Sequence, residues 1–105
     1  MEIDIERANW RQVLVNAQRH LQVYPLLGAT YARLGRACDE LDLDDQAIEA
    51  YRRLLLLDPA DPASVHYRLA LLLRRRDPTV AKRHVLDALA DAPRFRQAHR
   101  LLLEI

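Results

Sequence analysis

The sequence predicts an all-α fold, an α-solenoid of antiparallel helix hairpins, from three observations. Apolar residues recur at the spacing of one helix face, and the strict alternation of a half-buried strand occurs nowhere. Hydrophobic residues make up 50% of the chain and only two residues are glycine, which argues against disorder and against a loop-rich fold. Prolines recur every 34 residues, at Pro25, Pro59 and Pro93, and a fixed period of this size is typical of a repeat array.

Six apolar stripes predict six helices, over about 4–23, 26–40, 43–57, 62–75, 78–91 and 94–104. The stripes are, in order, Trp10, Val13, Leu14, Ala17, Leu21 and Tyr24; Leu27, Tyr31, Leu34, Cys38 and Leu41; Ala47, Ile48, Tyr51, Leu54 and Leu55; Val65, Leu69, Ala70, Leu72 and Leu73; Ala81, Val85, Ala88 and Leu89; and Phe95, Ala98, Leu102 and Leu103. The predicted connections are short, so helices that are neighbours in sequence are expected to pack antiparallel.

Residues typical of helix starts support these boundaries. Asp61-Pro62 and Asp77-Pro78 each place a capping carboxylate before a proline at the first helical position. Proline is tolerated there because its missing N–H would have no partner within the helix. Asp44 fits the first turn of the third helix, where the helix dipole favours a negative charge.

Composition excludes several functional classes. The net charge of +1 gives no global attraction to nucleic acid or to an anionic membrane. No apolar run approaches the roughly eighteen residues that a membrane-spanning helix needs. The acidic start lacks the pattern of a secretory signal, and the single cysteine, Cys38, excludes an intrachain disulfide. We therefore expect a soluble, cytoplasmic protein that contacts no membrane.

The sequence predicts neither an enzyme nor a metal or cofactor site. No two of its histidines lie three or four residues apart on one helix; they are His20, His66, His84 and His99. Cys38 lies on an apolar stripe and is expected to act as a small hydrophobic residue. The acidic run over 39–45 lacks the glycine of a calcium loop, so capping and solvation explain it. No phosphate-binding loop and no Ser-His-Asp set can be assembled.

The 34-residue pattern resembles the tetratricopeptide repeat, which reads W-x2-L-G-x2-Y, then A-x3-F, then P. One unit reads Tyr31-x2-Leu34-Gly35-x2-Cys38, Ala47-x3-Tyr51, Pro59, and the next reads His66-x2-Leu69-Ala70-x2-Leu73, Ala81-x3-Val85, Pro93. The resemblance implies a right-handed superhelix in a single domain over 1–105. Its expected divisions are a half-repeat over 4–25, repeats over 26–59 and 60–93, and a half-repeat over 94–105. His66 and His99 depart from the pattern, since both occupy the place of a packing aromatic residue.

Small residues are expected where the two helices of each hairpin cross. Gly35 and Ala70 would lie there, with Ala47 and Ala81 on the facing helices, so that the backbones approach closely. The aromatic rings of Tyr31 and Tyr51 would fill the space beside them. A helix-end glycine at position 35 is the alternative interpretation.

The resemblance implies a protein-interaction module that takes a peptide or protein in a concave groove lined by the first helices of the repeats. The groove residues carried over are Arg33, Arg36, Tyr67, Arg68, Arg74, Arg75 and Arg100. Residues 62–100 hold nine basic against three acidic residues, so an acidic partner is one interpretation, because guanidinium groups bind carboxylates in pairs of hydrogen bonds. A solvated basic face explains the same residues. The short run Arg74-Arg75-Arg76 has little aromatic interleaving, so nucleic acid is not expected as a partner.

The alternative function is structural: self-association, such as a homodimer, or service as a terminal part of a larger protein with no peptide ligand. The candidate self-association residues lie on the first and last predicted helices and are Trp10, Leu14, Leu102 and Leu103. We expect them to be uncovered because an array normally needs a polar capping helix for solubility. Exposed leucines favour association, since burying one is worth about 1.5–3 kcal/mol.

Overall fold

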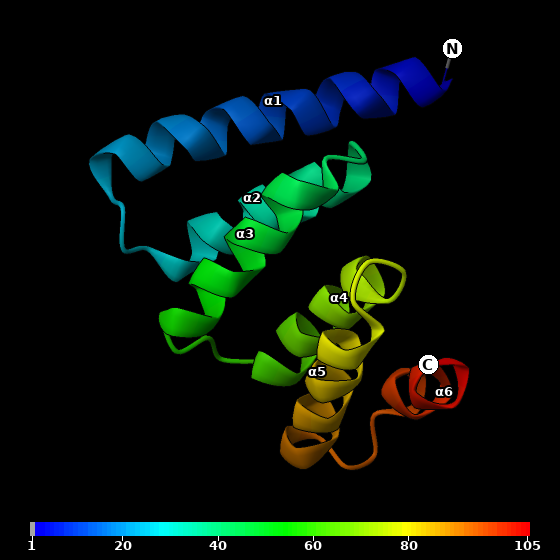
Figure 1. The fold of residues 1–105 in the computed structure, drawn as a ribbon. Helices are drawn as coiled ribbons and strands as arrows, with labels where there is room; N and C mark the ends of the chain where they lie inside the picture. Colours follow the sequence, from blue (N-terminus) through cyan, green and yellow to red (C-terminus); the bar gives the residue numbers. More distant parts are fainter. Residues whose placement is uncertain (1) are drawn as a thin grey trace. The chain divides into compact units, whose positions relative to one another are not determined.

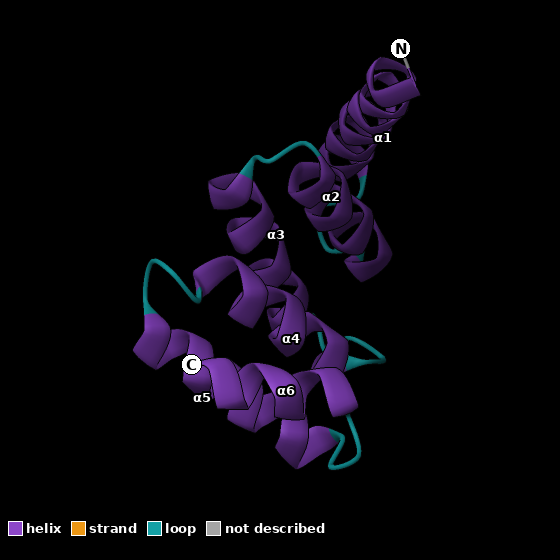
Figure 2. Ribbon diagram, turned by 90° about the vertical axis from the view of Figure 1, so that its right-hand side faces the viewer, coloured by secondary structure: helices purple, strands orange, loops and turns teal. Residues whose placement is uncertain are grey.

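The computed structural model describes residues 2–105, with side chains from Arg7 onward. It has six helices: α1 (Glu2–Val23), α2 (Gly28–Glu40), α3 (Asp44–Leu56), α4 (Pro62–Leu73), α5 (Pro78–Asp91) and α6 (Arg96–Glu104) (Figure 1). Over these described residues there is no strand (Figure 2). The all-α prediction is confirmed, and each helix begins and ends within two residues of its predicted bounds.

The helices fall into two compact units, residues 1–58 with α1 to α3 and residues 59–105 with α4 to α6. Within each unit consecutive helices pack on one another: α1 on α2, α2 on α3, α4 on α5 and α5 on α6. The boundary between the units lies one residue from the predicted boundary between the two full repeats. The single domain over 1–105 that the sequence predicted stays a prediction.

In the first unit, α1 is tied to α2 by polar contacts around the connection that joins them. Thr30 is fully buried at the start of α2, and its hydroxyl lies 2.8 Å from Nδ1 of His20 on α1. The hydroxyl of Tyr31 donates a hydrogen bond to the carbonyl oxygen of Pro25 at 2.9 Å. A buried hydroxyl without a partner would cost free energy, so both contacts fix the register of α1 against α2.

The α2–α3 hairpin closes on Gly35. A Cβ atom at this position would lie 2.8 to 3.0 Å from three ring atoms of Tyr51 on α3, closer than such atoms approach in proteins. Glycine is therefore required by the ring of Tyr51, which the sequence placed beside the small residues of this hairpin. Ala47 is itself fully buried, so the small residues do lie inside the hairpin. The alternative of a helix-end glycine is wrong, because α2 continues to Glu40.

The second unit begins both helices of its hairpin with the predicted caps. The carboxylate of Asp61 accepts a hydrogen bond from the backbone N–H of Ser64, and Asp77 accepts one from Val80, each at 3.3 Å. A proline follows each aspartate in the first turn. The hairpin core is aliphatic, with fully buried Leu69 on α4 and fully buried Val85 on α5.

The last helix turns a different face inward from the one that the sequence predicted. Ala98 and Leu101 are buried on α6, whereas Leu103, assigned to the apolar stripe, is 89% exposed. α6 packs on α5, and Ala98 and Leu101 are its buried residues. The short apolar run at the end of the chain could be placed on either face from spacing alone.

Candidate protein-interaction surface

The two groove residues predicted in the first unit differ in their surroundings. Arg33 is exposed on α2. Arg36 forms an ion pair with Glu40 at 3.1 Å, and its guanidinium carbon lies 5.5 Å from the ring centre of Trp10. Such a cation–π contact contributes about 0.5–1 kcal/mol at an exposed site. Arg36 is thus engaged by α1, and Trp10, predicted to be uncovered, is half-buried.

In the second unit, contacts near both ends of α6 link it to α4 and to the turn that follows α4. The rings of Tyr67 and Phe95 lie 5.0 Å apart, centre to centre, just before α6 begins. At the other ends of the two helices, Arg74 lies 4.0 Å from the carboxylate of Glu104. α4 and α6 therefore run in the same direction, as the first helices of successive repeats should. Tyr67 and Arg68 are half-buried on α4, and Arg100 is exposed on α6.

Arg74 and Arg75 do not lie on a helix face, although the sequence placed them there. α4 ends at Leu73, and Arg74, Arg75 and Arg76 form the exposed turn before α5. Asp77 caps α5 and Pro78 is its first residue, so only Arg74, Arg75 and Arg76 separate α4 from the cap of the next helix. The basic run is consequently an exposed turn, and Arg74 within it lies near Glu104.

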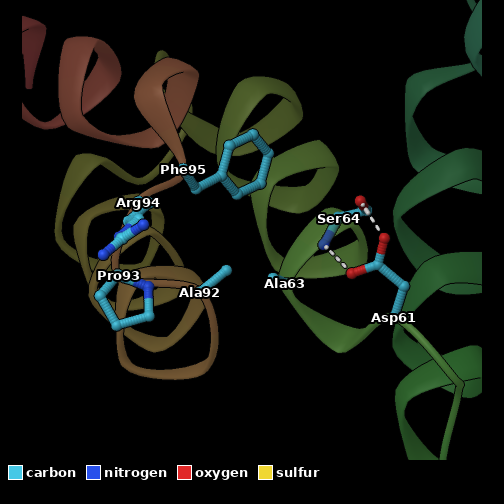
Figure 3. Close-up of a pocket in the computed structure, with 7 residues that line it drawn as sticks. All are labelled: Asp61, Ala63, Ser64, Ala92, Pro93, Arg94 and Phe95. Atoms are coloured by element: carbon cyan, nitrogen blue, oxygen red, sulfur yellow. Dashed lines mark hydrogen bonds between the residues drawn. The ribbon is translucent and has the colours of Figure 1, made fainter.

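A surface pocket of about 560 Å³ opens beside Phe95, at the start of α4 and the end of α5 (Figure 3). It is lined by Asp61, Ala63, Ser64, Ala92, Pro93, Arg94 and Phe95. Both carboxylate oxygens of Asp61 accept hydrogen bonds from Ser64, one from its backbone N–H and one from its hydroxyl at 2.6 Å, so both are engaged in the cap. Most of the remaining wall is apolar, and Arg94 supplies an exposed cation at the rim.

Sequence reasoning missed this pocket and Arg94. Phe95 was assigned only to the stripe of the last helix. The recurrence of Pro59 and Pro93 could have indicated the pocket. Each of these prolines lies in the connection between two helices, and the second lies in the pocket wall.

Exposed apolar residues are distributed differently from the prediction. Of the four candidate self-association residues, only Leu103 is strongly exposed, whereas Trp10, Leu14 and Leu102 are half-buried. A second group surrounds the connection between α1 and α2, and it comprises Val23, Tyr24, Leu26 and Leu27. The sequence placed Tyr24 and Leu27 on inward-facing stripes, but α1 ends at Val23 and α2 begins at Gly28, so neither residue continues a helix.

The cysteine and two of the histidines make contacts that serve the packing of the fold. Cys38 is fully buried, and burial raises the pKa of its thiol, so the group is neutral and acts as the small hydrophobic residue that was expected. His99 is exposed and its Nε2 lies 2.8 Å from the carbonyl oxygen of Pro93. His66, predicted at the equivalent repeat position, instead points to His84. No helix within residues 2–105 is long and apolar enough to cross a membrane.

The chain shows similarity to a subunit of a known protein complex. No protein-family model matches the chain. The chain is 40% identical over 75 residues, 70% of its length, to the anaphase-promoting complex subunit cut9 of Schizosaccharomyces pombe (strain 972 / ATCC 24843). The matched segment spans 11% of the length of that subunit. The six-helix structure, the recurring prolines and this similarity together fit the tetratricopeptide resemblance.

Proposed function

We propose that the chain is a protein-interaction module of the tetratricopeptide kind that helps to hold a protein assembly together, without a catalytic role. The observation that carries this proposal is the similarity to a subunit of the anaphase-promoting complex, which extends over 70% of the chain. A stack of helix hairpins suits the role, because it presents extended surfaces to a partner.

The second unit is proposed to receive an acidic segment of the partner. It carries nine basic and five acidic residues, a net charge of +4 with neutral histidines. Its exposed cations include the turn at Arg74 and Arg75, Arg94 at the pocket and Arg100 on α6. A basic surface attracts an acidic partner during diffusion, and guanidinium groups then pair with its carboxylates.

The pocket beside Phe95 is the proposed anchor for this segment. Its wall is mostly apolar and its rim carries Arg94, so an apolar side chain next to a carboxylate would satisfy both features. Buried apolar anchors supply most of the affinity of protein interfaces, whereas rim charges mainly set the association rate. Arg33 of the first unit remains a predicted contact.

Affinity capture with three forms of the chain, followed by mass spectrometry, tests the proposal. The wild type is compared with Arg74→Glu/Arg75→Glu in the second unit. Arg11→Glu/Arg19→Glu on α1 is the matched control, since it changes the net charge by the same amount at exposed sites of the first unit. We expect proteins with acidic segments to be captured by the wild type and the control, and lost with the first variant. Equal capture by all three forms would contradict an acidic ligand at the second unit.

Self-association is the second candidate function, and the exposure of Leu103 favours it. This side chain stands 89% exposed on α6, next to half-buried Leu102. A second copy could cover both, and two-fold dimers are the commonest closed assemblies. Light scattering after size exclusion at several dilutions distinguishes the candidates: a dimer that Leu103→Glu converts to a monomer would support self-association, and a monomeric wild type would exclude it.

A further inference from the structure

Three potential metal ligands meet on the α4–α5 hairpin. His66 lies on α4, and His84 and Asp87 lie on α5. Nδ1 of His66 is 2.9 Å from Nδ1 of His84, and the ring centres are 5.2 Å apart. One ligand atom from each of the three residues lies within 4.8 Å of the other two. The histidines are half-buried and Asp87 is exposed, so the cluster opens to solvent on the carboxylate side.

The hairpin itself holds these side chains in place. His84 and Asp87 are three residues apart, so they lie on one face of α5, one turn from each other. Val85, next to His84, and Leu69, one turn after His66, are both fully buried in the hairpin core. Rigid helices with buried neighbours position a ligand set more accurately than loops do.

We propose that His66, His84 and Asp87 bind a divalent transition-metal ion of the zinc class. Two imidazoles and one carboxylate form a donor set that suits Zn²⁺, whereas Ca²⁺ and Mg²⁺ prefer oxygen ligands throughout. With metal–ligand bonds of about 2.0–2.1 Å, two ligand atoms on a tetrahedral ion lie about 3.3 Å apart. The two imidazole nitrogens, at 2.9 Å, need to separate by only a few tenths of an ångström to accept the ion.

Three protein ligands leave the fourth position of a tetrahedral ion to water or to a group from another molecule. A positive side chain that pairs with Asp87 would compete with the ion. Arg83 precedes Asp87 by four residues on α5, where the two can pair across one helical turn. Removing this competitor with Arg83→Gln is therefore expected to strengthen metal binding.

Calorimetric titration of the chain with Zn²⁺ alone tests the proposal. We expect one ion per chain. Affinity should fall at least about tenfold in His84→Asn and in Asp87→Asn, as expected when a ligand is removed. His99→Asn is the matched control, since it also removes one histidine of the second unit but leaves the cluster intact, and it should bind like the wild type. Asp87 is exposed, so Asp87→Asn tests the ligand set without disturbing the hairpin core.

Titration with Co²⁺ gives an independent readout, because a tetrahedral site with nitrogen ligands produces visible absorption bands. We expect these bands in the wild type and in His99→Asn, and not in His84→Asn. The proposal is overturned if the wild type binds Zn²⁺ more weakly than about 1 mM. It is also overturned if His99→Asn weakens binding as much as His84→Asn does, since Zn²⁺ would then bind to histidines in general and not to this cluster.

Discussion

The hairpins α2–α3 and α4–α5 follow the same repeat pattern but fill their interiors differently. In the first, Gly35 lies under the ring of Tyr51. In the second, the corresponding pattern positions hold Ala70 and Val85, both fully buried. From the first hairpin to the second, glycine becomes alanine on one helix, and on the facing helix the ring of Tyr51 becomes the smaller side chain of Val85. The comparison teaches that the repeat constrains the combined volume of the pair more than the identity of either residue.

The helix starts differ as well. α2 and α3 begin after Leu27 and Leu43 without a side-chain cap, whereas α4 and α5 begin after aspartates that cap them. Charge separates the units too, because residues 1–58 carry seven basic and ten acidic residues and the second unit has a net charge of +4. The first unit therefore depends on the ring of Tyr51 and on contacts with α1, and the second on caps and an aliphatic core.

The largest expected effect is on the aliphatic core of the second unit. Leu69→Ala should lower the free energy of unfolding by about 2–5 kcal/mol, because it removes a fully buried side chain and leaves a cavity. Leu103→Ala is the matched control and should change it by less than about 0.5 kcal/mol, since this leucine is exposed. Chemical denaturation measures both. Equal effects of the two changes would contradict the face assigned to the core.

The next effect tests the fit between Gly35 and Tyr51. Gly35→Leu should cost roughly 1–3 kcal/mol of unfolding free energy through overpacking. Gly28→Ala is the control, since a Cβ there meets only ordinary contacts, at 3.5 Å from Leu54 and 3.9 Å from Leu57. If Tyr51 causes the cost, Gly35→Ala should be less harmful in a Tyr51→Val background, which imitates the second hairpin. A denaturation midpoint for Gly35→Leu equal to that of the wild type would refute this packing.

A smaller effect is expected at the caps of the second unit. Asp61→Ala and Asp77→Ala should each cost about 1 kcal/mol, because each leaves a backbone N–H of the first helical turn without its partner. Asp91→Ala, an exposed aspartate at the last residue of α5, is a control for loss of charge and should be near neutral or slightly stabilising. Thermal unfolding followed by circular dichroism separates the three variants. Equal midpoints would show that the caps contribute nothing.

The smallest effect concerns Cys38 in the first unit. Its pKa is raised by burial, so the folded state holds the thiol proton at a pH where the unfolded chain releases it. The stability that this provides is complete below the unfolded pKa of about 8.5 and decreases as the pH rises above it. Cys38→Ala should therefore flatten the alkaline decline of the unfolding free energy. Identical declines in both proteins would count against burial of the thiol.

Features that depend on local pattern could be predicted from the sequence. The six helices, the aspartate caps and the burial of Cys38 all follow from spacing and residue type within one segment. Features that combine segments could not be predicted. The cluster of His66, His84 and Asp87 joins two helices, and a search for two histidines on one helix cannot find it. The cation–π contact between Arg36 and Trp10 also depends on how α1 lies against α2.

Only part of the candidate interaction surface could be predicted from the sequence. Periodicity placed Arg74 and Arg75 on a helix face, but the early start of α5 puts them in a turn. The pocket beside Phe95 combines residues from the start of α4, the end of α5 and the connection to α6. Tertiary packing, which spacing does not encode, creates the pocket, whereas the turn follows from where α4 ends and α5 begins.

The most direct test of the central claim is the association rate of the captured partner as a function of salt concentration. The account predicts that the wild type associates more slowly as salt screens the basic surface, and that Arg74→Glu/Arg75→Glu is both slower and less sensitive to salt. Arg11→Glu/Arg19→Glu should retain the rate and salt dependence of the wild type. If both variants slow association equally, or if neither does, the second unit is not the surface that attracts an acidic partner.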